Sequence, residues 1–165
     1  MDRALKDIGL AVSIARCAGD GRVINVLGAP YVFKATSAET GNSFCCVEAS
    51  IAPGSSVPPH THTHEDEAFY VLAGEIILDT VDRPAPSRLG AGAFFFAPRG
   101  RQHSFRNEAE VEARILVFCL PGAGMERMFI DMDAAGCRNG GAPGTDEIVA
   151  ITARAGVIIA TPSKR

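Results

Sequence analysis

The chain has 165 residues, of which 47% are hydrophobic and 21% are charged. This length and balance fit one globular domain and exclude a multi-domain enzyme or a disordered chain. The net charge of −3, without a basic run, argues against a nucleic-acid partner, and no stretch reaches the ~20 apolar residues of a membrane span. We expect a single domain over residues 1–165, located in the cytoplasm because no signal peptide is evident.

The first twenty residues carry two periodicities. Apolar residues from Leu5 to Val12 suit a helix, whereas alternate residues from Ile8 to Ile14 suit a strand, so both interpretations stay open. From about residue 22 to residue 120, short apolar or alternating runs are separated by Gly, Pro, Asn or Asp at intervals of roughly 8–12 residues. This pattern predicts an all-β fold, an antiparallel barrel or sandwich. The expected strands are 22–27, 31–36, 43–51, 67–72, 75–81, 93–96, 102–107 and 113–120.

After Pro121 the period of the apolar residues becomes helical, which predicts a C-terminal helical extension over about 122–165. The first helix is expected to end at Gly136 and to pack on the barrel or across a dimer. A second short helix is expected over 145–155, ended by Gly156, before a short apolar segment at 157–160. The apolar stripe of the first helix consists of Met125, Met128, Phe129 and Met132.

Three of the four histidines fall within five residues, at positions 60, 62 and 64, and the fourth is His103. On an extended segment alternate residues share a face, so His60 and His62 can both point at one metal ion. Glu67 follows after a short turn, and a barrel could bring it and His103 into the same interior space. The alternative is that these histidines are solvated loop residues that follow two prolines.

Three imidazoles and one carboxylate suit a divalent first-row transition metal such as Fe, Mn, Ni, Cu, Co or Zn, whereas Mg²⁺ and Ca²⁺ prefer oxygen ligands. Four protein ligands on an octahedral ion leave two adjacent positions for water, dioxygen or a chelating substrate. Open positions of this kind distinguish a catalytic metal site from a structural one.

The residues around these candidate ligands resemble the two motifs of the cupin superfamily. The first motif is matched by Gly54, His60, His62, Glu67 and Gly74. The second motif is matched by Gly92, Pro98, Gly100, His103 and Asn107. The four glycines suit turns with positive φ, and Asn107 is expected to tie down a loop.

The resemblance implies a double-stranded β-helix, or jelly-roll barrel, with a metal bound inside by His60, His62, Glu67 and His103. It covers about residues 40 to 120. In some cupins the equivalent of Glu67 also serves as a catalytic base, so Glu67 is the candidate catalytic residue. The sequence looks most similar to single-domain cupins of the quercetin dioxygenase-like type, and cupins commonly pair their barrels, which implies a homodimer.

The alternation of side chains along the expected strands predicts further pocket residues. Phe69 and Phe105 are expected to face the cavity beside the metal, although filling of the barrel core would explain them equally. His64 falls outside the ligand spacing and is either an exposed loop histidine or a third pocket residue. Glu65 and Asp66 are expected to be solvated.

These features predict an enzyme, a metal-dependent oxidoreductase of the dioxygenase type that acts on a small bidentate enolate or phenolic substrate. The first alternative is a redox-neutral isomerase or decarboxylase that uses the same metal site. The second is a metal-containing protein that binds a small molecule without turnover. The resemblance to the superfamily does not decide among these, because fold does not fix the reaction.

Overall fold

The computed structural model describes residues 11–160. Residues 11–21 form neither helix nor strand, which corrects both expectations for that part of the N-terminal segment. The remainder of that segment, residues 1–10, lies outside the described residues. Within the described chain, no helix is long and apolar enough to cross a membrane.

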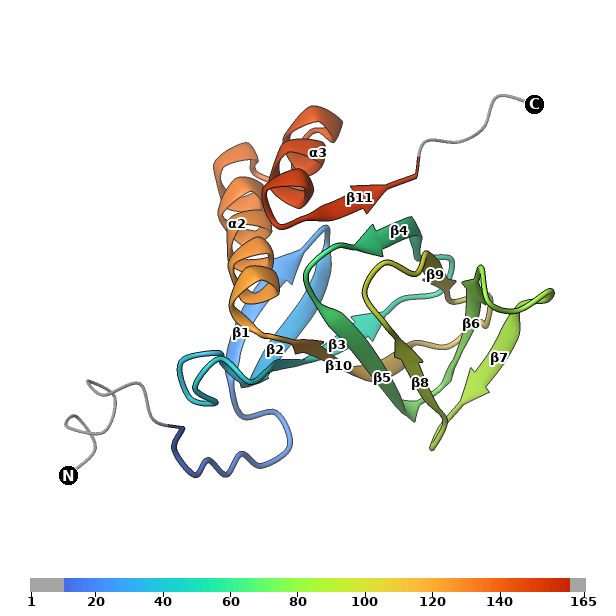
Figure 1. Cartoon of the computed structure of the whole chain (residues 1–165), viewed down its shortest axis with the longest axis horizontal. Helices are drawn as coiled ribbons and strands as arrows, with labels where there is room; N and C mark the ends of the chain where they lie inside the picture. The colour runs from blue at the N-terminus through green and yellow to red at the C-terminus, as the bar shows by residue number, and fades with distance from the viewer. Residues whose placement is uncertain (1–10, 161–165) are drawn as a thin grey trace.

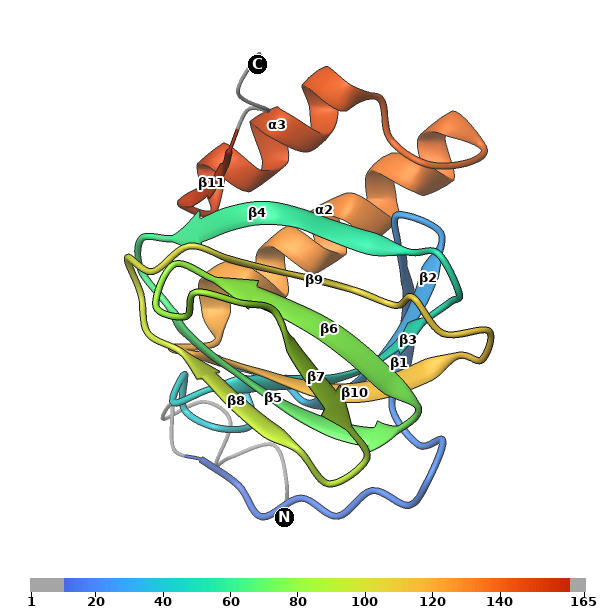
Figure 2. The ribbon, with the colours of Figure 1, turned by 90° about the vertical axis from the view of Figure 1, so that its right-hand side faces the viewer.

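The strands form two antiparallel sheets that face each other in a jelly roll, so the expected fold class is confirmed (Figure 1, Figure 2). The six-stranded sheet contains, in spatial order, β1 (Arg22–Val26), β2 (Ala29–Ala35), β3 (Cys45–Ile51), β10 (Ala113–Leu120), β5 (Asp66–Ala73) and β8 (Phe94–Ala97). The five-stranded sheet contains β11 (Val157–Ile159), β4 (Ser56–His62), β9 (His103–Arg106), β6 (Glu75–Thr80) and β7 (Ser87–Gly90).

The alternating pattern of β10 explains how the core forms between the sheets. Ala113, Ile115, Val117 and Cys119 are buried, while the intervening side chains face outward. Neighbouring strands contribute their own alternate residues to the same interior, because the period of a strand is two. The buried side chains of both sheets form one continuous hydrophobic cluster.

Strands β4 and β7 were not among the expected strands. Pro58 and Pro59 lie inside β4, where a proline removes a ladder hydrogen bond, and the pairing with β9 shifts register between Val57 and His60. The remaining residues of β4 still pair with β9 on one side and β11 on the other. Strand β7 follows Pro86 and, of the described strands, pairs with β6 alone at the edge of its sheet, a position that tolerates weak strand formers.

The C-terminal extension forms helix α2 (Ala123–Asn139), helix α3 (Thr145–Arg154) and strand β11. Helix α2 does not end at Gly136 as expected, because Gly140 provides the left-handed cap, with φ of 65°. Gly140 and Gly141 both donate backbone hydrogen bonds to the carbonyl of Gly136, which closes the last turn. Both helices lie at one end of the jelly roll, beside β1 and β11 (Figure 1).

Gly74, in the tight connection between β5 and β6, shows why one motif position requires glycine. Its φ is +70°, a conformation that other residues rarely adopt. An added Cβ would lie 2.7 Å from the carbonyl oxygen of Glu112 and 2.8 Å from Cα of Ala113. The other three motif glycines also have positive φ, as expected.

Glu39 forms a part-buried ion pair that ties the N-terminal segment to the sheet. The Arg16 guanidinium donates to Glu39 Oε1 at 2.6 Å and to the Lys34 carbonyl at 2.6 Å, and the backbone N–H of Thr36 donates to Glu39 Oε2 at 3.0 Å. The hydrogen bond from Arg16, followed by those from Thr36, outweighs burial and lowers the pKa of Glu39 from 4.5 to about 2.

We predict that Glu39→Gln lowers the free energy of unfolding by roughly 1–2 kcal/mol at pH 7. Because the folded-state pKa lies below the ordinary value of 4.5, the contribution of the pair is complete above that pH and is lost as the pH falls toward 2. The difference between wild type and variant in urea unfolding should therefore shrink from pH 7 to pH 3. Glu110→Gln, at an exposed site, is the control and should leave stability unchanged; an equal effect of both variants would contradict the prediction.

Candidate metal centre and its cavity

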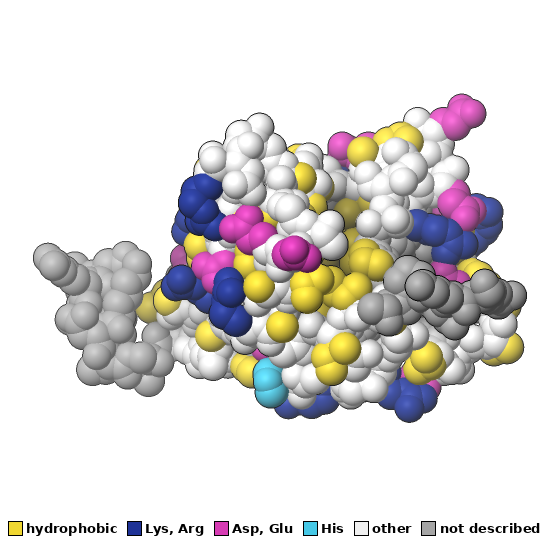
Figure 3. Space-filling view, turned by 90° about the horizontal axis from the view of Figure 1, so that it is seen from above, with side chains coloured by type: hydrophobic (Ala, Val, Ile, Leu, Met, Phe, Trp, Pro, Cys, Tyr) yellow, Lys and Arg dark blue, Asp and Glu magenta, His cyan; other side chains and the backbone are white. Residues whose placement is uncertain are grey.

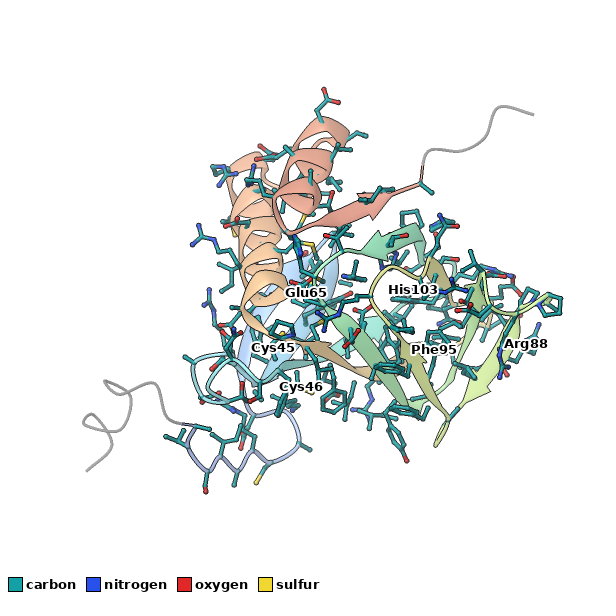
Figure 4. All side chains as sticks on the ribbon, viewed as in Figure 1. Cys45, Cys46, Glu65, Arg88, Phe95 and His103 are labelled. Atoms are coloured by element: carbon teal, nitrogen blue, oxygen red, sulfur yellow. The ribbon has the colours of Figure 1, made fainter. Side chains whose placement is uncertain are left out.

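Strands from both sheets bring the four predicted ligands together inside the jelly roll. His60 and His62 lie on the same face of β4, His103 on β9 is the register partner of His60, and Glu67 comes from β5 of the opposite sheet. One donor atom from each side chain lies within 4.8 Å of every other, and all four residues are buried. Figure 4 shows His103 within the interior, whereas Arg88 projects from the edge strand β7.

The distances between these donor atoms are those of groups that face a common centre. The Nε2 atoms of His60 and His62 are 3.1 Å apart, and Glu67 Oε2 lies 3.2 Å from His62 Nε2 and 2.9 Å from His103 Nε2. Ring nitrogen lone pairs and a carboxylate at such distances repel one another unless a proton or a cation lies between them. The donor set therefore fits a divalent transition metal.

The outer nitrogens of two rings are held by backbone carbonyls. His60 Nδ1 donates to the carbonyl of Pro58 at 2.9 Å, and His103 Nδ1 donates to the carbonyl of Arg101 at 3.3 Å. A proton on Nδ1 leaves the lone pair of Nε2 directed at the centre, which is the tautomer that a metal requires. Within the described chain, the corresponding Nδ1 of His62 is buried without a hydrogen-bond partner.

The electrostatics of the cluster favour an ionised Glu67 carboxylate and a neutral His60 imidazole. Burial alone would raise the pKa of Glu67, but the hydrogen bonds with His103 and His62 outweigh it and lower that pKa well below the ordinary value. Burial lowers the pKa of His60 to about 4, so this ring is neutral at pH 7. For His62, burial opposes the charged form, but the hydrogen bond with Glu67 and its negative charge outweigh burial and raise the pKa.

A cavity of about 450 Å³ opens beside the cluster and reaches the C-terminal helices. His60, His62 and Glu67 form its polar end, and most of the remaining wall is apolar. Helix α2 contributes the side chains of Met125, Met128, Phe129 and Met132 to this wall. Figure 3 looks down on this end of the molecule and shows hydrophobic side chains gathered in the middle, between charged side chains at the sides.

Two of the three predicted pocket residues line the cavity. Phe69 and Phe105 do so, with their ring centroids 5.5 Å apart, and Phe69 also contacts the ring of His103 edge-on. His64 is exposed and is not among the residues that line the cavity, so its nomination as a pocket residue is wrong. The physical reason is that β4 ends at His62, and the strand alternation on which the nomination depended ends with it.

Sequence reasoning missed the position of Glu65 and part of the cavity wall. Glu65 was expected to be solvated but is only 3% exposed, whereas Asp66 is half-buried and accepts hydrogen bonds from Arg99. The spacing of the methionines identified a packed helix, but not that its apolar face lines the cavity. No local signal in the sequence indicates the burial of Glu65, and the cavity wall likewise depends on tertiary packing.

The geometry defines a jelly roll with a buried three-histidine, one-carboxylate cluster, and comparisons with known proteins agree. Residues 47–119 match the family model described as Cupin domain. Within that segment the chain is similar to the cupin family. The matched segment contains all four residues of the cluster.

Curated relatives align with less than half of the chain. Protein SchB of Streptomyces halstedii is 38% identical over 68 residues, which cover 41% of this chain and 48% of SchB. Nectarin-1 of Nicotiana langsdorffii x Nicotiana sanderae is 34% identical over 68 residues, which cover 39% of this chain and 30% of nectarin-1. The chain thus spans less than half the length of these relatives.

Solved structures share the fold. The polyketide cyclase RemF from Streptomyces resistomycificus superposes with a TM-score of 0.57 at 23% identity, covering 66% of this chain and 80% of RemF. A predicted oxalate decarboxylase from Thermotoga maritima has the same TM-score at 22% identity, covering 66% of this chain and 99% of that protein. At such identities the likeness concerns the fold and not the reaction.

Proposed function

We propose that this protein is a metal-dependent enzyme, an oxidoreductase of the dioxygenase type, that acts on a small, largely apolar molecule with a bidentate enolate or phenolic group. The observation that carries the proposal is the convergence of four donor atoms at the polar end of an apolar cavity. His60, His62, His103 and Glu67 would hold one divalent transition metal ion. A bound ion would supply Lewis-acid and redox chemistry, with coordination positions left for substrate.

The cavity wall supports the substrate class. Of the described residues, no lysine or arginine lines the cavity, so the wall offers no cationic partner to a carboxylate or phosphate group. The arginines near the second motif, Arg99, Arg101 and Arg106, form ion pairs with surface acids instead. A phenol or enol buries its hydrocarbon body at a lower desolvation cost than a small dianion such as oxalate.

The chain's own residues have distinct roles in this proposal. Phe69, Phe105 and the α2 side chains exclude water and bury the hydrocarbon part of the ligand. Glu67 is ionised and close to two imidazoles, so it can hold the metal and accept a proton from a bound enol or phenol.

The test is oxygen uptake by the metal-loaded protein with a panel of flavonols, diketones and acireductones. Consumption that requires both the metal and the organic compound would support the proposal, and chelator-treated protein is the control. Product formed equally well without oxygen would replace it with a redox-neutral isomerase or decarboxylase. Saturable binding without turnover would indicate a binding protein, and failure of the protein to retain any divalent transition metal would reject the metal site itself.

A further inference from the structure

The three histidines of the cluster differ in what holds the outer side of their rings. Backbone carbonyls accept from Nδ1 of His60 and of His103. Among the described residues, His62 Nδ1 and Glu65 Oε2 are the two buried side-chain polar atoms without a hydrogen-bond partner. Leaving a buried donor and a buried acceptor unsatisfied costs free energy in each case, so this pair requires an explanation.

Glu65 is close to His62 and is confined there. It lies in the turn between β4 and β5, three residues after His62, and the charges of the two side chains interact. On its other side, Glu65 Oε1 contacts the first turn of α2, where a Cβ added to Gly124 would lie 2.3 Å from that oxygen. Figure 4 shows Glu65 between the start of α2 and the jelly roll.

A single water molecule can satisfy both unpaired atoms. The two side chains make no direct hydrogen bond, and a buried water requires at least two polar partners, which an Nδ1–H and a carboxylate oxygen supply. A histidine that binds a metal through Nε2 donates its other N–H to a carboxylate, a carbonyl or a water in nearly all known sites. Nδ1 of His60 and of His103 follows this rule through carbonyls, whereas Nδ1 of His62 lacks a direct partner and the Glu65 carboxylate is close to that side chain.

We propose that Glu65 is a positioning residue of the metal centre, which accepts the Nδ1–H of His62 through one buried water and thereby holds Nε2 toward the metal. The inference rests on the proposed metal site. It explains why a carboxylate is retained in a buried position where it forms no ion pair with any residue that the structure describes. It also links helix α2 to the metal, because the first turn of α2 confines the Glu65 side chain.

The experiment measures two properties of Glu65→Ala and Glu65→Gln: the affinity for Co²⁺ and the unfolding midpoint of the metal-free protein. Asp66→Asn is the matched control, since it removes one negative charge from the neighbouring position, where the side chain pairs with Arg99 at the surface. We expect Glu65→Ala to weaken Co²⁺ binding roughly 10- to 100-fold. Glu65→Gln keeps an acceptor oxygen and should recover most of that loss, and Asp66→Asn should leave the affinity unchanged.

Metal-free Glu65→Ala should unfold close to the wild type, because removing the desolvated carboxylate offsets the loss of the water-mediated contact with His62. A merely structural role would lower this midpoint instead. Proton NMR of the Co²⁺-loaded protein gives a third readout, since ring N–H signals of ligating histidines are shifted by the paramagnetic ion. The His62 signal should exchange with solvent and disappear in Glu65→Ala, while the His60 signal persists.

Three outcomes would overturn this inference: unchanged Co²⁺ affinity in both Glu65 variants, a His62 signal that survives in Glu65→Ala, or a midpoint that falls in parallel with the affinity. A Glu65→Ala protein that does not fold counts as the third outcome. Failure of the wild-type protein to bind Co²⁺ would instead reject the proposed metal site. The two failures are therefore distinguished by the wild-type measurement alone.

Discussion

Replacing His103 by alanine is expected to abolish specific metal binding at micromolar metal and, with it, any metal-dependent turnover. His103 comes from β9, in register with His60 on β4, and its Nε2 lies 2.9 Å from Glu67 Oε2. Loss of a residue that only hydrogen-bonds to a metal ligand lowers metal affinity roughly 10- to 100-fold, so loss of a ligand itself should lower it more than about 100-fold. Metal content after gel filtration and titration calorimetry would measure the effect.

His64→Ala is the matched control for that experiment. It removes the same side chain two residues after His62, but from an exposed position outside the cavity. Metal affinity should be unchanged in this variant. Equal loss in both variants would mean that the histidines bind metal as a solvated cluster, and retention of tight binding by His103→Ala would remove His103 from the site.

Asn107→Ala is expected to cause the largest loss of stability among single changes outside the metal centre. Asn107 is 1% exposed, and its Nδ2 donates to the carbonyls of Ile51 and Val111, each at 2.8 Å. Its Oδ1 accepts from the backbone N–H of Ala109 at 2.9 Å. Alanine would leave three backbone groups without these partners, at a cost on the order of 3 kcal/mol in unfolding free energy.

A loss of that size corresponds to a fall of roughly 6–12 °C in the melting temperature of a chain of this length. Calorimetry of the metal-free protein would measure it. Asn139→Ala removes a surface hydrogen bond to Glu147 at the end of α2 and should change the melting temperature little. If Asn107→Ala melted with the wild type, the expected role of Asn107 in tying down its loop would be wrong.

The sequence predicted the fold class from the rhythm of its short apolar runs, and the grouping of the four ligands from two motifs that resemble those of cupins. Alternate positions on a strand place His60 and His62 on one face, and the motif glycines adopt the left-handed conformations that glycine favours. Strand β4 was not among the expected strands, although His60 and His62 were placed on an extended segment. Pro58 and Pro59 disfavour a paired strand, and the pairing of β4 with β9 and β11 overrides that local preference. Gly136 was expected to be the cap, but α2 continues to Asn139 and Gly140 adopts the left-handed conformation instead.

Other features of the site could not be predicted from spacing. Burial of Glu65 results from the approach of α2 to the turn after β4, two segments about sixty residues apart in the chain. A carboxylate beside a polar motif normally stays in water, so composition pointed the other way. The apolar wall likewise forms only when α2 and α3 pack across the open end of the jelly roll (Figure 2).

Strand β11 pairs with β4 such that Val157 lies opposite His62 and Ile159 opposite His60. The four candidate ligands and much of the cavity wall nevertheless lie in separate parts of the sequence, because α2 and α3 lie outside the segment that matches the family model. Protein engineers can exploit this separation. A library of variants confined to Met125, Met128, Met132 and Ile148 would vary the shape of the cavity, while every candidate ligand keeps its strand and register.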